Sequence, residues 1–202
     1  SNSNGLTPMM KQYLEIKEEY FEEILFYRMG DFYEMFFNDA KVASSVLDIT
    51  LTKRGQWNNN DIPMCGIPFH SSESYLSKLI SNGYRVAVCE QINEIENDVK
   101  KNKGPMKRKV VRVITPGTVL EESFFDDNPN NFLCSWNEVN GHHSISWVDL
   151  STGIFCVQKI DINQSNAFET ALERLSPREL IMPLKMKEQK PQYFRGCVTF
   201  QA

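Results

Sequence analysis

A pair of aromatic, β-rich runs that meet at Gly30-Asp31 constrains the fold of this chain more than any other feature. The runs occupy residues 25–29 and 32–36. A two-residue loop with Gly first suits the primed turns of a β-hairpin, because Gly adopts positive φ readily and these turns keep the twist of the flanking strands. Residues two apart leave a strand on the same face, so Phe32 and Glu34 are predicted to stand side by side.

The face that carries Phe32 and Glu34 is predicted to be a binding edge. A Phe in an alternating strand is most often a core residue. A carboxylate on the same face needs a partner or water, however, because burying it unpaired costs on the order of several kcal/mol. We therefore expect this face to be exposed, or to be completed by a molecule other than this chain.

Composition excludes several classes of protein. No window approaches the run of about 20 apolar residues that a membrane span needs, and the polar residues 1–6 are expected to be a flexible lead-in or a cloning remnant rather than a signal peptide. We expect a cytoplasmic protein without a membrane partner. The five cysteines are odd in number and far apart, without a Cys-x-x-Cys motif, so no zinc or other metal site is predicted. They are Cys65, Cys89, Cys134, Cys156 and Cys197.

The net charge of −4 argues against indiscriminate attraction to a polyanion, so any nucleic-acid contact must depend on local basic patches. One such patch is the stretch 100–112, which holds seven Lys and Arg residues and no acidic residue. Two interpretations stay open for it. It is either a solvated loop with a basic edge or a rim that contacts phosphates.

The first half of the chain is expected to alternate helices and strands. Helices are predicted over residues 7–23, 38–47 and 71–80, and strands over 49–53, 84–92 and 109–115. A Thr7-Pro8 start suits the first helix, and Asn38 or Asp39 is expected to cap the second. A polar loop is expected over 55–61. The two prolines and the glycine of residues 62–68 predict an irregular segment there.

The second half changes to an antiparallel meander. Strands are predicted over residues 132–136, 143–150 and 154–160, followed by a helix over 166–175 and strands over 176–182 and 198–200. Three antiparallel strands, a crossover helix and a fourth strand form the opening of a ribonuclease-H-like sheet, which we expect to be incomplete here. The predicted fold class is therefore α/β (α+β), with a mixed sheet in the first domain and the truncated ribonuclease-H-like sheet in the second.

Several stretches resemble the N-terminal part of the MutS family, the bacterial DNA mismatch-recognition ATPases. The most telling are Phe26-Tyr27-Arg28-Met29-Gly30-Asp31-Phe32-Tyr33-Glu34 and Ile62-Pro63-Met64-Cys65-Gly66-Ile67-Pro68-Phe69-His70, and further matches occur at residues 7–13, 51–55, 88–92, 109–112, 115–118 and 149–153. The resemblance implies a mismatch-recognition domain over residues 7–122, a linker over 123–131, and a ribonuclease-H-like connector domain over 132–202.

The resemblance also implies the site. Phe32 and Glu34 match a Phe-x-Glu motif that enters the DNA minor groove, where an inserted ring must unstack a base step and does so most easily where pairing is already faulty. Glu34 is expected to hydrogen-bond the mispaired base. Arg54 and Arg108 are expected to hold phosphates, and Met64 to lean against the groove. No catalytic residue is predicted.

Two alternatives stay open. A ribonuclease-H-like fold can carry metal-dependent nuclease activity on clustered carboxylates, for which Asp149 at a strand end is a candidate. The second domain can instead be a relay that docks partners without touching DNA. No Gly-x-x-x-x-Gly-Lys-Ser/Thr segment occurs, so this chain is not expected to be an enzyme or to hold a cofactor. The resemblance implies that ATP, magnesium and a homodimer belong to the full-length protein, with mismatched duplex DNA and a MutL-like repair protein as partners.

Overall fold

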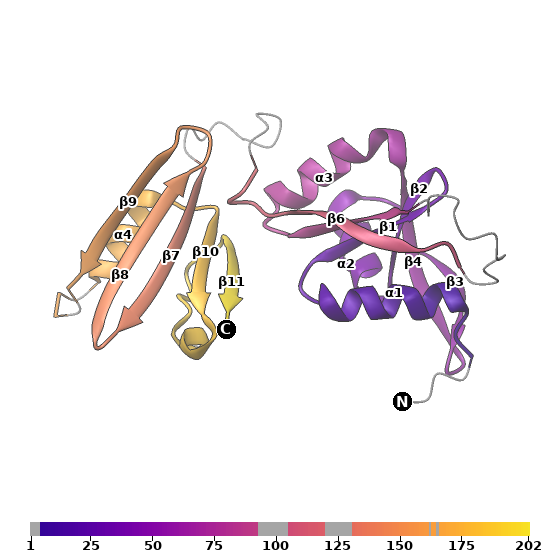
Figure 1. Cartoon of the computed structure of the whole chain (residues 1–202), viewed down its shortest axis with the longest axis horizontal. Coiled ribbons are helices and arrows are strands. Elements are labelled where there is room, and N and C mark those ends of the chain that lie inside the picture. Colours follow the sequence, from indigo (N-terminus) through magenta and orange to yellow (C-terminus); the bar gives the residue numbers. More distant parts are fainter. Residues whose placement is uncertain (1–4, 93–104, 120–130, 162, 165) are drawn as a thin grey trace, which may run out of the picture. The chain divides into compact units, whose positions relative to one another are not determined.

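The computed structural model describes residues 5–92, 105–119, 131–161, 163–164 and 166–202. The chain divides into two compact units, Ser1–Val113 and Ile114–Ala202, each built around its own sheet (Figure 1). Both units combine helices with a sheet of mixed strand direction, which confirms the predicted α+β class. Among the described residues, no helix is both long enough and apolar enough to cross a bilayer.

The first unit has a six-stranded sheet in the order β3-β4-β2-β1-β5-β6. The β1–β2 pair is antiparallel, as are the β2–β4 and β3–β4 pairs, whereas β1 runs parallel to β5. The strands are β1 Ile24–Met29, β2 Phe32–Phe36, β3 Thr52–Trp57, β4 Asn60–Pro68, β5 Val86–Gln91 and β6 Arg108–Ile114.

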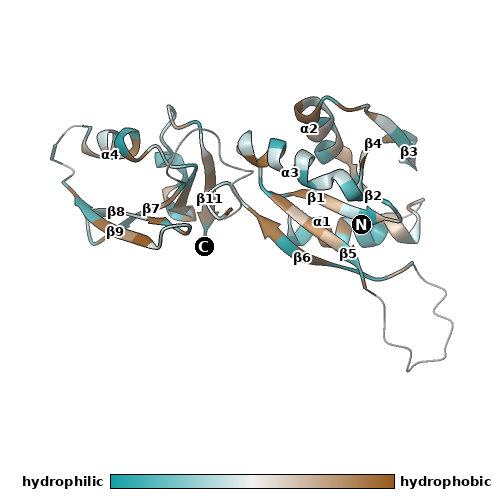
Figure 2. Cartoon of the chain, turned by 90° about the horizontal axis from the view of Figure 1, so that it is seen from above, coloured by the Kyte–Doolittle hydropathy of each residue, from teal (hydrophilic) through white to brown (hydrophobic). Residues whose placement is uncertain are grey.

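Three helices accompany this sheet: α1 Pro8–Glu19, α2 Phe37–Leu47 and α3 Ser72–Ser81. On one face, Tyr13 of α1 packs its ring edge-on against Tyr27 and Phe36, with centroids 5.4 and 5.0 Å away. Figure 2 shows α2 and α3 together on one side of the strands. The predicted start of α1 is confirmed, because the Thr7 hydroxyl accepts the Met10 N–H at 3.2 Å.

The expectation that Asn38 or Asp39 caps the second helix is wrong. The N-cap of α2 is Phe36, without a side-chain bond to the helix. Asp39 instead is buried in the first turn, where its carboxylate accepts the Leu25 N–H at 2.9 Å and lies 3.0 Å from the Lys17 ammonium. Burial raises the pKa of Asp39, against the opposing effect of Lys17. Its role is therefore to join the helix to the sheet.

The expected loop over 55–61 and the irregular segment over 62–68 are also wrong, because β3 and β4 form a hairpin that turns at Asn58-Asn59. Both turn residues have positive φ, which Asn tolerates. The prolines fit because β4 changes partner at Met64. Pro63 pairs only with β3, and Pro68 only with β2. A proline can lie in a strand where its missing N–H has no partner to serve.

The second unit contains the predicted meander, crossover helix and fourth strand, in the sheet order β11-β10-β7-β8-β9. The β7–β8 and β8–β9 pairs are antiparallel, and β10 lies parallel to both β7 and β11. The elements are β7 Phe132–Val139, β8 His142–Asp149, β9 Ile154–Ile160, α4 Ala167–Leu175, β10 Glu179–Pro183, the 3₁₀ helix η3 Leu184–Gln189 and β11 Cys197–Gln201.

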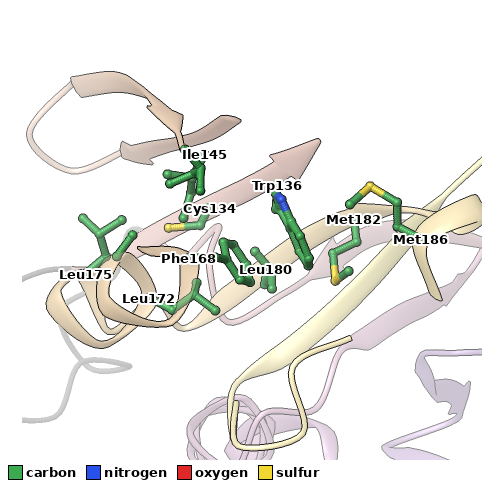
Figure 3. Close-up of a cluster of buried hydrophobic side chains, with 11 residues drawn as sticks. Cys134, Trp136, Ile145, Phe168, Leu172, Leu175, Leu180, Met182 and Met186 are labelled. Carbon is green, nitrogen blue, oxygen red and sulfur yellow. The ribbon is translucent and has the colours of Figure 1, made fainter. Parts of the chain in front are cut away.

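The core of the second unit lies between α4 and the sheet (Figure 3). Trp136 of β7 stacks on Phe168 of α4 with ring centroids 3.8 Å apart, and Leu172 and Leu175 of the same helix are buried in the same cluster. These positions recur at helical spacing, as the sequence pattern predicts.

The segment that leads into the second unit is bound to its sheet. The Gly117 N–H donates to the buried Glu179 carboxylate at 3.1 Å, and Glu179 also accepts the Thr199 hydroxyl at 2.8 Å. The structural division after Val113 therefore falls earlier than the expected domain end at residue 122. Of the predicted linker 123–131, only Asn131 lies within the described residues.

Candidate functional site

The hairpin predicted from the sequence is present and carries Phe32 at its tip. β1 and β2 are antiparallel with Met29 opposite Phe32, and Gly30 has a φ of +59°. The Phe32 side chain is exposed, whereas Tyr33 on the opposite face is buried. The alternation expected for the second arm is thus confirmed, and a large apolar ring stands free at a turn.

The turn behind Phe32 is held from the opposite face of the sheet. The Arg28 Nε donates to the Gly30 carbonyl at 2.5 Å, and the Arg28 guanidinium carbon lies 3.3 Å from the centroid of the Phe69 ring. The Phe69 N–H in turn donates to the Asp31 carbonyl at 2.8 Å. These contacts join the turn to the segment after β4, so the hairpin tip is fixed on a supported base.

Glu90 completes this support. It lies 3.6 Å from the Arg28 guanidinium and accepts a short hydrogen bond from the Tyr33 hydroxyl. Burial, together with this carboxylate, raises the pKa of Tyr33 above its usual range, so the hydroxyl remains a donor. Sequence reasoning missed these contacts because Phe69 and Glu90 are distant from the hairpin along the chain.

Glu34 stands beside Phe32 as predicted, and its carboxylate is bound by Arg54. A single guanidinium nitrogen, Nη1, lies 2.6 and 2.5 Å from the two carboxylate oxygens. The side chain of Glu34 is 13% exposed and that of Arg54 is 42% exposed. Both residues are predicted site residues, but their pairing is visible only in the fold.

A β-bulge brings Arg54 to this position. The register between β3 and β4 shifts between Lys53 and Gln56, and Gly55 within the shift has a φ of +70°. Bulges of this kind redirect the neighbouring side chain. Arg54 therefore reaches from β3 across β4 to Glu34 on β2.

Gly66 of β4 leaves the room for this contact. It pairs with Glu34, and a Cβ placed on it would lie 3.8 Å from the Glu34 Cγ and 3.9 Å from the Phe32 Cδ1. Any branched side chain at position 66 would stand between the ring and the carboxylate. A cavity of about 400 Å³ borders the same region, with Arg54 and Met29 in its lining.

Met64 lies farther from the hairpin tip than Phe32. It pairs with Phe36 of β2 and is half-buried against the core beneath α1. Phe32 pairs with Pro68, four residues along β4 from Met64. The structure thus brings Phe32, Glu34 and Arg54 together and puts Met64 at the covered end of the same face.

Arg108 is engaged by the base of the hairpin. Its Nε donates to the Arg28 carbonyl at 2.7 Å, its Nη1 lies 3.1 Å from the Gln12 amide oxygen, and its guanidinium lies 4.6 Å from the centroid of the Tyr27 ring. Of the predicted basic stretch 100–112, residues 100–104 lie outside the described part of the chain.

Asp149, the candidate nuclease residue, caps a turn. One carboxylate oxygen accepts the Ser151 N–H at 2.9 Å, the Ser151 hydroxyl at 2.6 Å and the Thr152 N–H at 3.3 Å. The Ser151 hydroxyl above all holds the pKa of Asp149 below its usual range, against the effect of burial. Among the described residues, no group of three or more His, Cys, Asp or Glu side chains is arranged to hold a metal.

Comparison with known proteins identifies relatives over nearly the whole chain. A family model described as MutS domain I matches residues 7–123, and one described as MutS domain II matches residues 131–202. The DNA mismatch repair protein MutS of Wolbachia pipientis wMel is 49% identical over 183 residues, which are 90% of this chain and 21% of that protein. The protein of the same name from Staphylococcus haemolyticus (strain JCSC1435) is 47% identical over 185 residues, which are 92% of this chain and 20% of that protein. The chain spans about a fifth of the length of these relatives.

Proposed function

Since the chain belongs to the MutS family of DNA mismatch repair proteins, we propose that its first unit recognises mispaired or unpaired bases by inserting Phe32 into the minor groove of duplex DNA. The observation that carries the proposal is the exposed ring of Phe32 on a supported hairpin tip, next to a carboxylate.

Wedge insertion discriminates because it acts on stacking. An apolar ring inserted between base pairs must unstack the step, at a cost on the order of a few kcal/mol, and a mismatched step resists less. The same step bends more easily, so the kinked complex is also less costly to form there. Because the contacts behind the turn already hold the ring in place, less binding free energy is needed to order the protein when the ring inserts.

Glu34 adds a second source of discrimination. A mispaired base has a hydrogen-bond donor free, whereas a Watson–Crick base has already used its own. A carboxylate in the groove of sound duplex meets repulsion with little return, so it lowers general affinity and raises selectivity.

The other three candidates have supporting parts in the proposal. Arg54, half-exposed beside Glu34, contacts phosphate and positions the wedge. Arg108 and Met64 hold the strands behind the hairpin, in keeping with their contacts to Arg28 and to Phe36. Their direct contact with DNA stays a prediction.

Phe32→Ala tests the proposal. We expect it to weaken mismatch binding by about 1–3 kcal/mol, the range for base–aromatic stacking, with the melting temperature nearly unchanged. Phe36→Ala is the matched control on the same strand and face. Its ring is buried, so its removal should destabilise the fold by about 3–5 kcal/mol. Intact mismatch binding by folded Phe32→Ala would refute the wedge.

The second unit is proposed to dock a MutL-like repair partner and to relay the state of the DNA. In support, the family model described as MutS domain II matches residues 131–202. ATP hydrolysis with magnesium and homodimer formation are proposed for parts of the full-length protein outside the two matched domains. A nuclease is not favoured, since Asp149 serves its own turn.

A further inference from the structure

We propose that Arg54 is a latch on Glu34 that sets mismatch discrimination: it covers the carboxylate in the free protein and on sound duplex, and releases it only to a mispaired base. This inference rests on the proposed wedge function and deepens it. It assigns to Arg54 a positioning and specificity role that a plain phosphate contact would not have.

In this structure, Arg54 occupies the carboxylate of Glu34. One Arg54 nitrogen bridges both carboxylate oxygens of Glu34, at 2.6 and 2.5 Å, and the Glu34 side chain is only 13% exposed. A base donor approaching Glu34 therefore meets the guanidinium first. A mispaired base therefore competes with Arg54 for the Glu34 carboxylate, and the base gains the stronger hydrogen bond when Arg54 moves aside.

The ion pair between Glu34 and Arg54 can be replaced by other contacts at little cost in free energy. An ion pair at a partly exposed site contributes little net free energy, because water and salt screen it. Within the part of the chain that the structure describes, Glu34 is the one hydrogen-bond acceptor of the Arg54 guanidinium. The remaining guanidinium N–H groups can take up a phosphate as the bridge to Glu34 opens.

Arg54 lies on a strand that allows the residue to move. Among the residues that the structure describes, β3 pairs only with β4 and so lies at the edge of the first sheet. Arg54 lies in the bulge of that strand, next to Gly55 at positive φ, where the ladder is already interrupted. Arg54 can therefore move without breaking a second ladder of hydrogen bonds.

These features couple two contacts that would otherwise be independent. With the latch closed, sound duplex faces a neutral pair rather than a bare carboxylate. With the latch open, Glu34 accepts a hydrogen bond from the mispaired base, and the Arg54 guanidinium contacts a phosphate of the DNA backbone. The phosphate contact of Arg54 is then strengthened specifically at a mismatch.

A double-mutant cycle tests the latch. Wild type, Arg54→Gln, Glu34→Gln and the double variant are titrated in the full-length polypeptide against matched duplex and a single-mismatch duplex of the same length, at one salt concentration. Arg54→Gln should weaken mismatch binding more than matched-duplex binding, because the phosphate contact that Arg54 makes on leaving Glu34 forms only at a mismatch. The tightening of matched-duplex binding caused by Glu34→Gln should be about two- to tenfold greater in the Arg54→Gln background than in wild type.

Lys53→Gln is the matched control. It removes one positive charge from the neighbouring position of β3, and Lys53 pairs with Asp61 rather than with Glu34. Lys53→Gln should change the dissociation constants for the matched and the mismatched duplex by the same factor, or leave both unchanged. An equal loss with both duplexes for Arg54→Gln, together with additive effects in the cycle, would overturn the latch and leave a plain phosphate contact.

The design separates this failure from that of the proposed function. Phe32→Ala reports on the wedge alone, since the Glu34–Arg54 pair does not include that ring. Loss of mismatch binding in Phe32→Ala with an additive cycle would keep the wedge and reject the latch. Unchanged mismatch binding in Phe32→Ala would reject both.

Discussion

Phe32 and Phe36 leave the same face of β2, yet the first is 48% exposed and the second is fully buried. The difference comes from α1, whose Tyr13 covers Phe36 with ring centroids 5.0 Å apart. One end of the face is thus core and the other is an open surface. The same strand thus anchors the hairpin in the fold and leaves its tip exposed.

Glu34→Ala should bind matched duplex more tightly and separate matched from mismatched DNA less well. The substitution removes the negative charge that offsets Arg54 on sound duplex, and it also removes the acceptor for the mispaired base. Fluorescence titration of the full-length variant against both duplexes measures the ratio of the dissociation constants. A ratio equal to that of wild type would contradict the role proposed for Glu34.

The pair Gly66→Ala and Gly66→Val should separate stability from recognition. A Cβ at position 66 has its nearest contacts at 3.6 to 3.9 Å, which is ordinary packing, so the Ala variant should gain about 0.5–1 kcal/mol from the lost flexibility of Gly. The added methyl groups of Val would press on Phe32 and Glu34. We expect the Val variant to melt like wild type and to lose mismatch binding; equal binding by both variants would exclude crowding of the site.

Gly117→Ala should destabilise the second unit by about 1–3 kcal/mol, the range for overpacking. A Cβ at this position would lie 2.8 Å from the Glu179 Cβ and 2.9 Å from the Leu133 Cδ1, closer than carbon atoms tolerate. Hydrogen exchange of the β7 and β10 amides measures the change within that unit. Thr118→Ala, at an exposed neighbour, should change stability by no more than about 0.5 kcal/mol, and an equal effect of the two would refute the steric explanation.

Asp149→Asn should make stability depend less on pH. The pKa of Asp149 lies below its ordinary 3.8 in the folded protein, chiefly because of the Ser151 hydroxyl. The ionised group therefore stabilises the fold above about pH 3.8, and this stabilisation is lost as the pH falls through the lower folded-state value. Urea unfolding at several pH values measures the free energy of unfolding. At neutral pH this free energy should be larger for wild type than for Asp149→Asn, and the difference should shrink as the pH falls. A constant gap would mean that charge is not involved.

Local patterns predicted much of the fold because the deciding contacts are near in sequence. The turn at Gly30 needs one residue with positive φ, and the Thr7 cap needs only the next helical turn. The β4 strand escaped prediction for the opposite reason. Whether Pro63 is tolerated depends on which strands lie beside it, and that is a property of the whole sheet.

In the candidate site, too, local features could be predicted from the sequence and long-range contacts could not. Phe32 and Glu34 could be placed on one face from strand period alone. The pairing of Glu34 with Arg54 could not, since it depends on a bulge and on an intervening strand that the sequence pattern does not reveal. Asp39 was misassigned because a carboxylate near a helix start is usually a cap, and here the nearest unsatisfied N–H belongs to Leu25 of the sheet.

The exchange of partners along β4 has a mechanical consequence. Up to Met64 this strand pairs with β3, and from Met64 onward it pairs with β2, so the two hydrogen-bond ladders share a single residue. The β3–β4 ladder and the β2–β4 ladder therefore meet at Met64, so a change in one ladder need not break the hydrogen bonds of the other.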